Sequence, residues 1–200
     1  MFEIPECEVF FLNTKKKVTR KPVYNLFKDK SVLVLGVSSA YNPVDTQMVK
    51  DWEKSYEDIK AAGNVDEIYV LVVASPYVVD AWFKSMKIKK LKPIPDGNAA
   101  FALRLEDTFG LCSGTYVVRR WDKGENQGCW RTAWISEDGV VLKHWEEEWD
   151  QANDKRHNFA DELYNEMKPE NMIANLKHRN QKSRIDEANA STLIDPAAPA

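Results

Sequence analysis

The side chains best able to do covalent chemistry in this chain are three cysteine thiols, at Cys7, Cys112 and Cys129. A thiolate is a nucleophile that can be oxidised, so each is a candidate redox or catalytic group. Their number is odd, no two form a CxxC pair, and no histidine lies nearby at the spacing of a zinc site. The pattern argues against a disulfide framework and predicts reduced thiols with no metal and no cofactor.

Two further positions could influence a thiol. Asp45 opens a predicted helix, where a carboxylate caps N–H groups and meets the positive end of the helix dipole. Arg131 follows Cys129 by two residues, so in a regular strand both side chains share one face. Cys129 is therefore the best candidate nucleophile. Against this, a strand cysteine lacks the helix N-terminus that lowers a thiol pKa, and buried cysteine usually serves as a small apolar group.

The first half of the chain has an α/β pattern that must position these residues. Continuous apolar, β-branched runs predict strands buried on both faces, and apolar residues at helical spacing follow each run. The order strand, helix, strand, helix predicts parallel pairing with right-handed crossovers. The predicted strands are Ser31–Val37 and Ile68–Ala74, and the predicted helices cover 48–63 and a segment opened by Ser75 and Pro76.

The second half has an antiparallel pattern. The strand-like runs Thr115–Trp121 and Cys129–Ile135 are joined by the polar loop DKGENQG, which predicts a hairpin. A turn at 136–139 then leads into a predicted strand at Val140–His144. Together the halves predict an α/β fold with a mixed central sheet flanked by helices.

Several segments between Pro22 and Lys143 occur in a characteristic order: PVYNLFKDKSVLVLGVSSAYNPVD, then LVVASPYVVDAW, PDGNAAFALRL and WRTAWISEDGVV. This order resembles the peroxiredoxin-5-like redoxins of the AhpC/TSA superfamily. The resemblance implies a thioredoxin-like fold formed by residues 1–148 together with 168–176. It also implies a helical insertion at 149–167 and a C-terminal extension at 177–200. The last part of that extension, DEANASTLIDPAAPA after Ile185, has almost no large apolar side chains, so we expect it to be flexible in isolation.

The resemblance places the family's P-G-A-F-T-P-T-C loop on residues 38–45 of this sequence. Its first proline corresponds to Ser38, its threonine to Asn42 and its peroxidatic cysteine to Asp45, whereas the arginine of a later strand is kept as Arg131. A carboxylate cannot take a peroxide oxygen as a recyclable product, so the resemblance implies loss of peroxide reduction at this position. Family geometry further implies an ion pair between Asp45 and Arg131 that stabilises the fold.

Three hypotheses about function follow. The first is a non-catalytic peroxiredoxin-like domain that acts as a structural or interaction protein, with a large assembly such as a virus particle as one setting. The second is a divergent thiol peroxidase that uses Cys129 or Cys112. The third is a binding protein that holds a small polar ligand around Asn42, Asp45 and Arg131.

The C-terminal part of the chain supplies candidate contacts with a protein partner or with a second copy. Tryptophan is enriched at interface hot spots, and two tryptophans lie in the acidic stretch WEEEWD. A basic run, KHRNQKSR, follows them. The candidate interface residues are Trp145, Trp149, Lys177, Arg179, Lys182 and Arg184.

Composition excludes other classes of partner. The 28 basic and 31 acidic side chains give a net charge of -3, which argues against a broad nucleic-acid-binding surface. The first residues include Glu3, Glu6 and Glu8 and lack the order of a secretory signal. No apolar run reaches the length of about 18 residues that a membrane span needs. We therefore predict a soluble, cytoplasmic protein.

Overall fold

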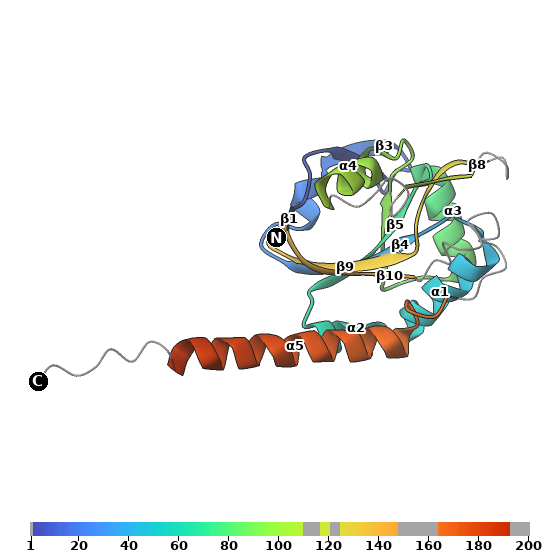
Figure 1. Cartoon of the computed structure of the whole chain (residues 1–200). Helices are drawn as coiled ribbons and strands as arrows, with labels where there is room; N and C mark the ends of the chain where they lie inside the picture. The colour runs from blue at the N-terminus through green and yellow to red at the C-terminus, as the bar shows by residue number, and fades with distance from the viewer. Residues whose placement is uncertain (1, 110–116, 121–124, 148–163, 193–200) are drawn as a thin grey trace, which may run out of the picture.

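The computed structural model describes residues 2–109, 117–120, 125–147 and 164–192. Within them a six-stranded sheet has the strand order β1-β10-β9-β4-β5-β6 (Figure 1). This arrangement confirms the predicted fold class, a mixed sheet flanked by helices. The strands are β1 (Phe2–Glu3), β4 (Ser31–Val37), β5 (Glu67–Val72), β6 (Lys92–Pro95), β9 (Thr132–Glu137) and β10 (Val140–Glu146).

The sheet has a parallel half and an antiparallel half. Strands β4, β5 and β6 run parallel, whereas β9 pairs antiparallel with both β4 and β10. Strand β1 pairs with β10 only at Val140 and Val141. Strand β4 is central and buried on both faces, as its run of apolar residues predicts.

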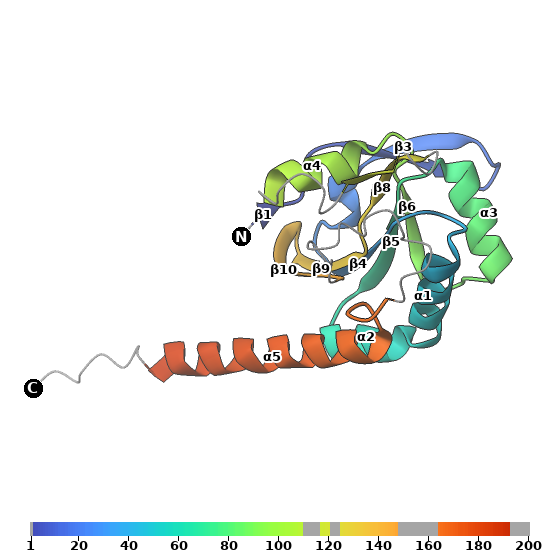
Figure 2. The same cartoon turned by 45° about the vertical axis from the view of Figure 1, so that its right-hand side comes forward.

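Helices cover both faces of the sheet (Figures 1 and 2). Apolar residues of α1, α2, α3 and α5 form one core, and residues of η1 and α4 form a second core against the other face. The helices are η1 (Val23–Leu26), α1 (Pro43–Lys54), α2 (Tyr56–Gly63), α3 (Pro76–Met86), α4 (Ala100–Phe109) and α5 (Pro169–Thr192).

Two small hairpins lie outside the main sheet: β2 (Glu8–Leu12) with β3 (Val18–Pro22), and β7 (Val117–Arg120) with β8 (Glu125–Cys129). The second hairpin corrects a prediction. The expected strand Cys129–Ile135 is divided, because its first residue ends β8 while the rest, from Thr132, forms β9 between β4 and β10. The chain changes pairing partner at Trp130 and Arg131, and a pattern of apolar residues does not reveal that change.

The predicted single helix over 48–63 is also wrong in its bounds. The structure has α1 beginning at Pro43 and a separate α2, with Ser55 between them as the C-cap of the first. Strand β6 and helix α4 were not predicted. The buried Asp96 stabilises the first turn of α4, because its carboxylate accepts hydrogen bonds from the N–H groups of Phe101 and Ala102.

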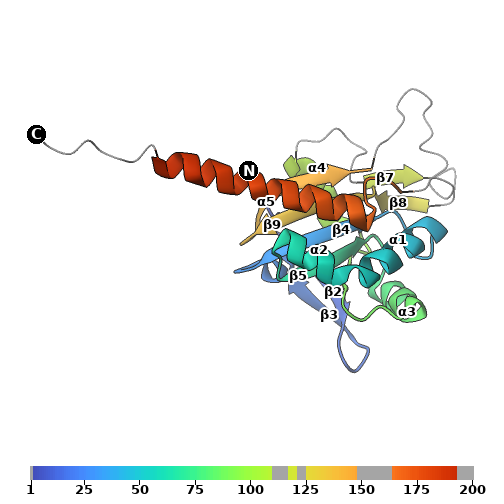
Figure 3. The ribbon, with the colours of Figure 1, turned by 90° about the horizontal axis from the view of Figure 1, so that it is seen from below.

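Helix α5 lies along α2 and extends beyond the body of the domain (Figure 3). Met172 and Leu176 are fully buried in the first core. Beyond them, Asn180 Nδ2 donates a hydrogen bond to the carbonyl oxygen of Ala62 at 2.8 Å. The helix therefore continues through Leu176 to Thr192 without a break at the predicted start of the extension.

Candidate functional site

The loop that follows β4 arranges the first turn of α1. Asn42 is the N-cap residue, and its Oδ1 accepts hydrogen bonds from the N–H groups of Val44 at 2.9 Å and Asp45 at 3.2 Å. Pro43 occupies the first helical position, where a missing N–H costs no hydrogen bond. This cap places Asp45 at the positive end of the helix dipole.

Asp45 forms a buried ion pair with Arg131. Its Oδ1 accepts a hydrogen bond from Arg131 Nε at 2.7 Å. Its Oδ2 accepts from the Ser39 N–H at 2.9 Å and from the Ser38 hydroxyl. The side chains of Asp45 and Arg131 are 0% and 1% exposed, so water and salt screen the pair little. The structure thus brings Ser38, Asp45 and Arg131 into direct contact, with Asn42 capping the same helix.

The chemistry open to this cluster is limited. Both carboxylate oxygens of Asp45 accept hydrogen bonds, and the carboxylate balances the charge of the Arg131 guanidinium. Ser38 and Asn42 are both buried as well. A small polar ligand would have to displace the internal contacts of the cluster, and binding of such a ligand stays a prediction.

Two glycines let the strands approach this loop closely. A Cβ on Gly128 of β8 would collide with the Ser38 carbonyl oxygen. A Cβ on Gly36 of β4 would lie 2.7 Å from Thr132 Cγ2 and 2.9 Å from Cys129 Sγ. The close packing of β8 and β9 on the end of β4 brings Arg131, which lies between these two strands, to Asp45.

Cys129 lies in a different environment from Arg131. The two residues do not share a strand, because β8 ends at Cys129 and β9 begins at Thr132. The Cys129 side chain is fully buried in the second core, whereas the apolar residues of α1 around Asp45 belong to the first. The same-face geometry that favoured Cys129 as a nucleophile therefore depends on a regular strand that the structure does not contain.

Of the other two thiols the structure describes only Cys7, which gives no support for a relocated nucleophile. Burial, together with the nearby charge of Asp96, raises the pKa of Cys7 to about 11, although Arg104 opposes the shift. Such a thiol is almost entirely protonated near neutral pH. Cys112 lies outside the described residues.

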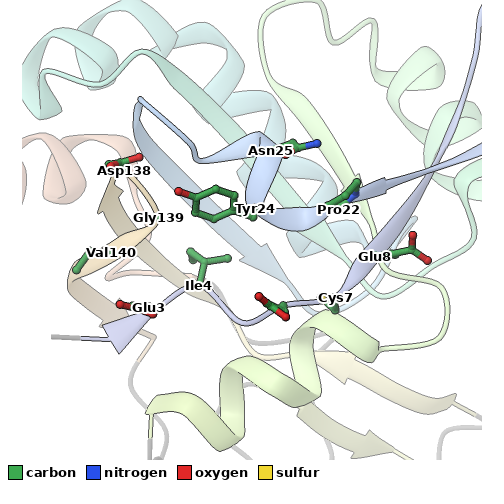
Figure 4. Close-up of a pocket in the computed structure, with 11 residues that line it drawn as sticks. Glu3, Ile4, Cys7, Glu8, Pro22, Tyr24, Asn25, Asp138, Gly139 and Val140 are labelled. Atoms are coloured by element: carbon green, nitrogen blue, oxygen red, sulfur yellow. The ribbon is translucent and has the colours of Figure 1, made fainter.

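An acidic pocket that the sequence did not suggest lies beside Cys7. It has a volume of about 660 Å³, and its wall includes Ile4 and the ring of Tyr24 (Figure 4). Its carboxylates come from Glu3, Glu6, Glu8 and Asp138. The sequence places three of these carboxylates near the N-terminus. It does not show that Asp138 joins them, because the pairing of β1 with β10 brings together residues that are far apart in the chain.

Glu147 joins the end of β10 to the segment that precedes α5. Its carboxylate accepts hydrogen bonds from three backbone N–H groups, those of Asn165 at 2.6 Å, Glu166 at 2.9 Å and Met167 at 3.1 Å. Trp52 Nε1 donates to the Met167 carbonyl oxygen at 2.7 Å. Tyr164 and Met167, which fall within the predicted insertion, are buried in the first core.

Replacement of Glu147 by alanine is expected to lower the free energy of unfolding by about 2–4 kcal/mol. The reason is that three N–H groups, one of them buried, lose a charged acceptor. Urea denaturation measures this change. The exposed Glu6→Ala variant is the matched control, and a Glu147→Ala variant as stable as that control would show that water replaces the carboxylate without cost.

The candidate interface residues fall into two groups. Trp145, Arg179 and Lys182 line one groove between β10 and α5. Lys177 lines a separate groove between α2 and α5. Arg184 lies in α5, and Trp149 lies outside the described residues.

The part of the chain that the structure describes contains no group of three or more His, Cys, Asp or Glu side chains able to hold a metal ion. No helix in that part is long and apolar enough to cross a membrane.

The chain is similar to peroxiredoxins in sequence and in structure. Residues 5–163 match the family model described as Redoxin. A peroxiredoxin of Rhizobium etli is 30% identical over 158 residues, which are 78% of this chain and 80% of that protein. The Plasmodium falciparum antioxidant protein, a 1-Cys peroxiredoxin, superposes with a TM-score of 0.73 at 26% identity, over 88% of this chain and 96% of that one. Reduced Prx3 of Vibrio vulnificus, solved with hydrogen peroxide, superposes with a TM-score of 0.68 at 22% identity, over 87% and 96%, and at that identity shows the fold alone.

Proposed function

Because the chain belongs to the redoxin family, we propose that it keeps the family's fold without peroxide chemistry and acts as a structural or interaction protein. The observation that carries this proposal is the buried ion pair between Asp45 and Arg131, with 2.7 Å between Oδ1 and Nε. Peroxide reduction by a thiol requires a thiolate that attacks one peroxide oxygen while a cationic group stabilises it. The resemblance assigns the position of that thiolate to Asp45, and the Asp45 carboxylate engages the Arg131 guanidinium.

The environments of the described thiols support the proposal. Cys129 is completely buried and belongs to the second core, so its sulfur is not accessible at the surface. Cys7 has a raised pKa of about 11. Neither side chain lies at the N-terminus of a helix.

The C-terminal part of the chain supports an interaction role. Helix α5 continues past Leu176 and extends away from the sheet and its covering helices (Figure 2). Trp145 and two basic residues of α5 line one groove. A large assembly, such as a virus particle, is one setting that we propose for such a role.

Treatment of the full-length protein with hydrogen peroxide, followed by intact-mass spectrometry, tests the loss of peroxide chemistry. We expect no rapid addition of oxygen to any cysteine. Because the pKa of Cys7 is about 11 against 9.0 for an ordinary thiol, we also expect its alkylation by iodoacetamide at pH 7 to be about a hundredfold slower than that of a model cysteine peptide.

Rapid, stoichiometric oxidation would contradict the proposal and favour the divergent thiol peroxidase. The Cys129→Ser and Cys112→Ser variants would then identify the reactive thiol. If oxidation persisted in both single variants, Cys7 would be the remaining site.

A further inference from the structure

The groove between β10 and α5 has the size of a small-ligand site. Its volume is about 510 Å³, and pockets of about 300–1,000 Å³ are the ones in which proteins bind small molecules. One wall comes from β10 and the other from α5. A ligand bound there would add a binding activity to the proposed interaction role, which does not require one.

The wall on β10 depends on an irregularity in that strand. The pairing register of β10 with β9 shifts between Val141 and Lys143, which leaves Leu142 as an extra residue. A bulge of this kind re-aims side chains. Neighbouring side chains of a regular strand point to opposite faces, but here Leu142 and Lys143 both line the groove, together with Trp145. Leu142 and Trp145 also pack against the first core, so the groove has an apolar floor.

The wall on α5 is one polar and basic face of the helix. The residues that line the groove from α5 are Asn175, His178, Arg179 and Lys182. Each lies three or four positions from another of the set, the spacing that places side chains together on a helix. Arg179 and Lys182 are cations at neutral pH, and His178 can become one. Lys143 adds a third cation from the opposite wall.

Internal contacts leave the charge of the groove largely uncompensated. Among the described residues, no carboxylate lies within ion-pair distance of Lys143, Arg179 or Lys182, and the side-chain hydrogen bond of Arg179 goes to the neutral amide of Asn180 at 3.1 Å. Burial lowers the pKa of Arg179, although the charge of Glu137 opposes this effect. A bound anion would compensate the charge of this partly buried guanidinium.

We propose that the groove binds a small aromatic phosphate of the nucleoside monophosphate class. A phosphate monoester carries a charge of about -1.5 to -2 at pH 7, which the three cations Lys143, Arg179 and Lys182 balance better than a single carboxylate would require. The aromatic base lies on the apolar floor, where the indole of Trp145 provides a stacking surface. The amide of Asn175 can both donate to and accept from the polar edge of the base.

Isothermal titration calorimetry of the full-length protein with AMP tests this proposal. We expect saturable binding, and at least about tenfold weaker binding of inorganic phosphate, which has no base to stack, and of adenosine, which has no charge. Inorganic phosphate that binds as tightly as AMP would show a site for any small anion and overturn the proposal. Absence of binding by AMP, GMP, CMP and UMP would also overturn it.

Variants assign the binding to the groove. The Arg179→Ser, Lys182→Ser double variant should bind AMP at least about tenfold more weakly, because two of three cations are lost. Trp145→Leu keeps an apolar floor but loses the stacking surface, so we expect AMP to bind at least about fivefold more weakly. Lys177→Ser is the matched control, since Lys177 lies on the same helix but lines the other groove. Unchanged circular dichroism checks that each variant folds, and wild-type affinity in the double variant would overturn the proposal.

Amide chemical shifts in NMR spectra locate the ligand directly. AMP should shift the amide signals of residues 142–145 and 175–182. Shifts confined to residues 38–45 and Arg131 would place the ligand at the Asp45 cluster and overturn the proposal. An acidic peptide or a single-stranded oligonucleotide that binds more tightly than AMP would assign the groove to a macromolecule instead. None of these results depends on cysteine oxidation, so failure of this inference and failure of the proposed function are distinguishable.

Discussion

Replacement of Arg131 by methionine is expected to lower the free energy of unfolding by about 3–5 kcal/mol, as measured by urea denaturation. The substitution leaves the Asp45 carboxylate fully buried without its 2.7 Å partner. Two hydrogen bonds remain, from the Ser39 N–H and the Ser38 hydroxyl, but they do not replace the lost positive charge. Asp45→Ala is expected to have a similar cost, because it removes the carboxylate that forms the buried ion pair with the Arg131 guanidinium.

The double variant Asp45→Ala, Arg131→Met separates the ion pair from a general packing defect. Removing both charges leaves no buried unpaired ion, so the double variant should be more stable than either single variant. Arg20→Met is the control, because Arg20 forms an exposed pair with Glu8 at 3.4 Å and such pairs contribute little. If Asp45→Ala lost no stability, the ion pair would not stabilise the fold.

Replacement of Asp45 by cysteine is expected to create a thiol that reacts with hydrogen peroxide. The introduced sulfur would lie at the N-terminus of α1, beside Arg131 and within reach of the Ser39 N–H. These groups stabilise a thiolate and lower its pKa. If the pKa falls by about one unit, alkylation at pH 7 becomes about tenfold faster than for a model cysteine peptide.

Peroxide oxidation of the Asp45→Cys variant provides the second measurement. The thiolate sulfur attacks one oxygen, the O–O bond breaks, and the second oxygen leaves as hydroxide and is protonated to water. Intact-mass spectrometry should show one added oxygen atom, with Asp45→Ser as the isosteric control that gains none. A thiol at position 45 that stays reduced would show that a cysteine at this position is not sufficient for peroxide chemistry.

The central sheet could be predicted from the sequence where a strand is buried on both faces. SVLVLGV predicts β4 with the bounds that the structure has, because the apolar run is bounded by polar and small residues. Strand β6 could not be predicted, since KPIP contains two prolines and pairs only with β5 at the edge, where a missing N–H is tolerated.

The candidate site could be predicted only through the resemblance. Nothing in the local pattern around Asp45 or Arg131 indicates a pair, because the contact joins residues 86 positions apart. The sequence does not indicate the division between β8 and β9 for a related reason. The pairing partners of a strand are set by the whole sheet, whereas periodicity reports only which side chains are buried.

The distance along the chain between Asp45 and Arg131 also affects how the protein is made. Arg131 follows Asp45 by 86 positions, and residues leave the ribosome at about 5–20 per second, so for several seconds α1 and β4 exist without β9 or the guanidinium. During that interval the carboxylate cannot be buried without penalty, and the open edge of β4 is exposed to other chains. Completion of the sheet and neutralisation of its buried charge must then both wait until Arg131 and β9 have been synthesised.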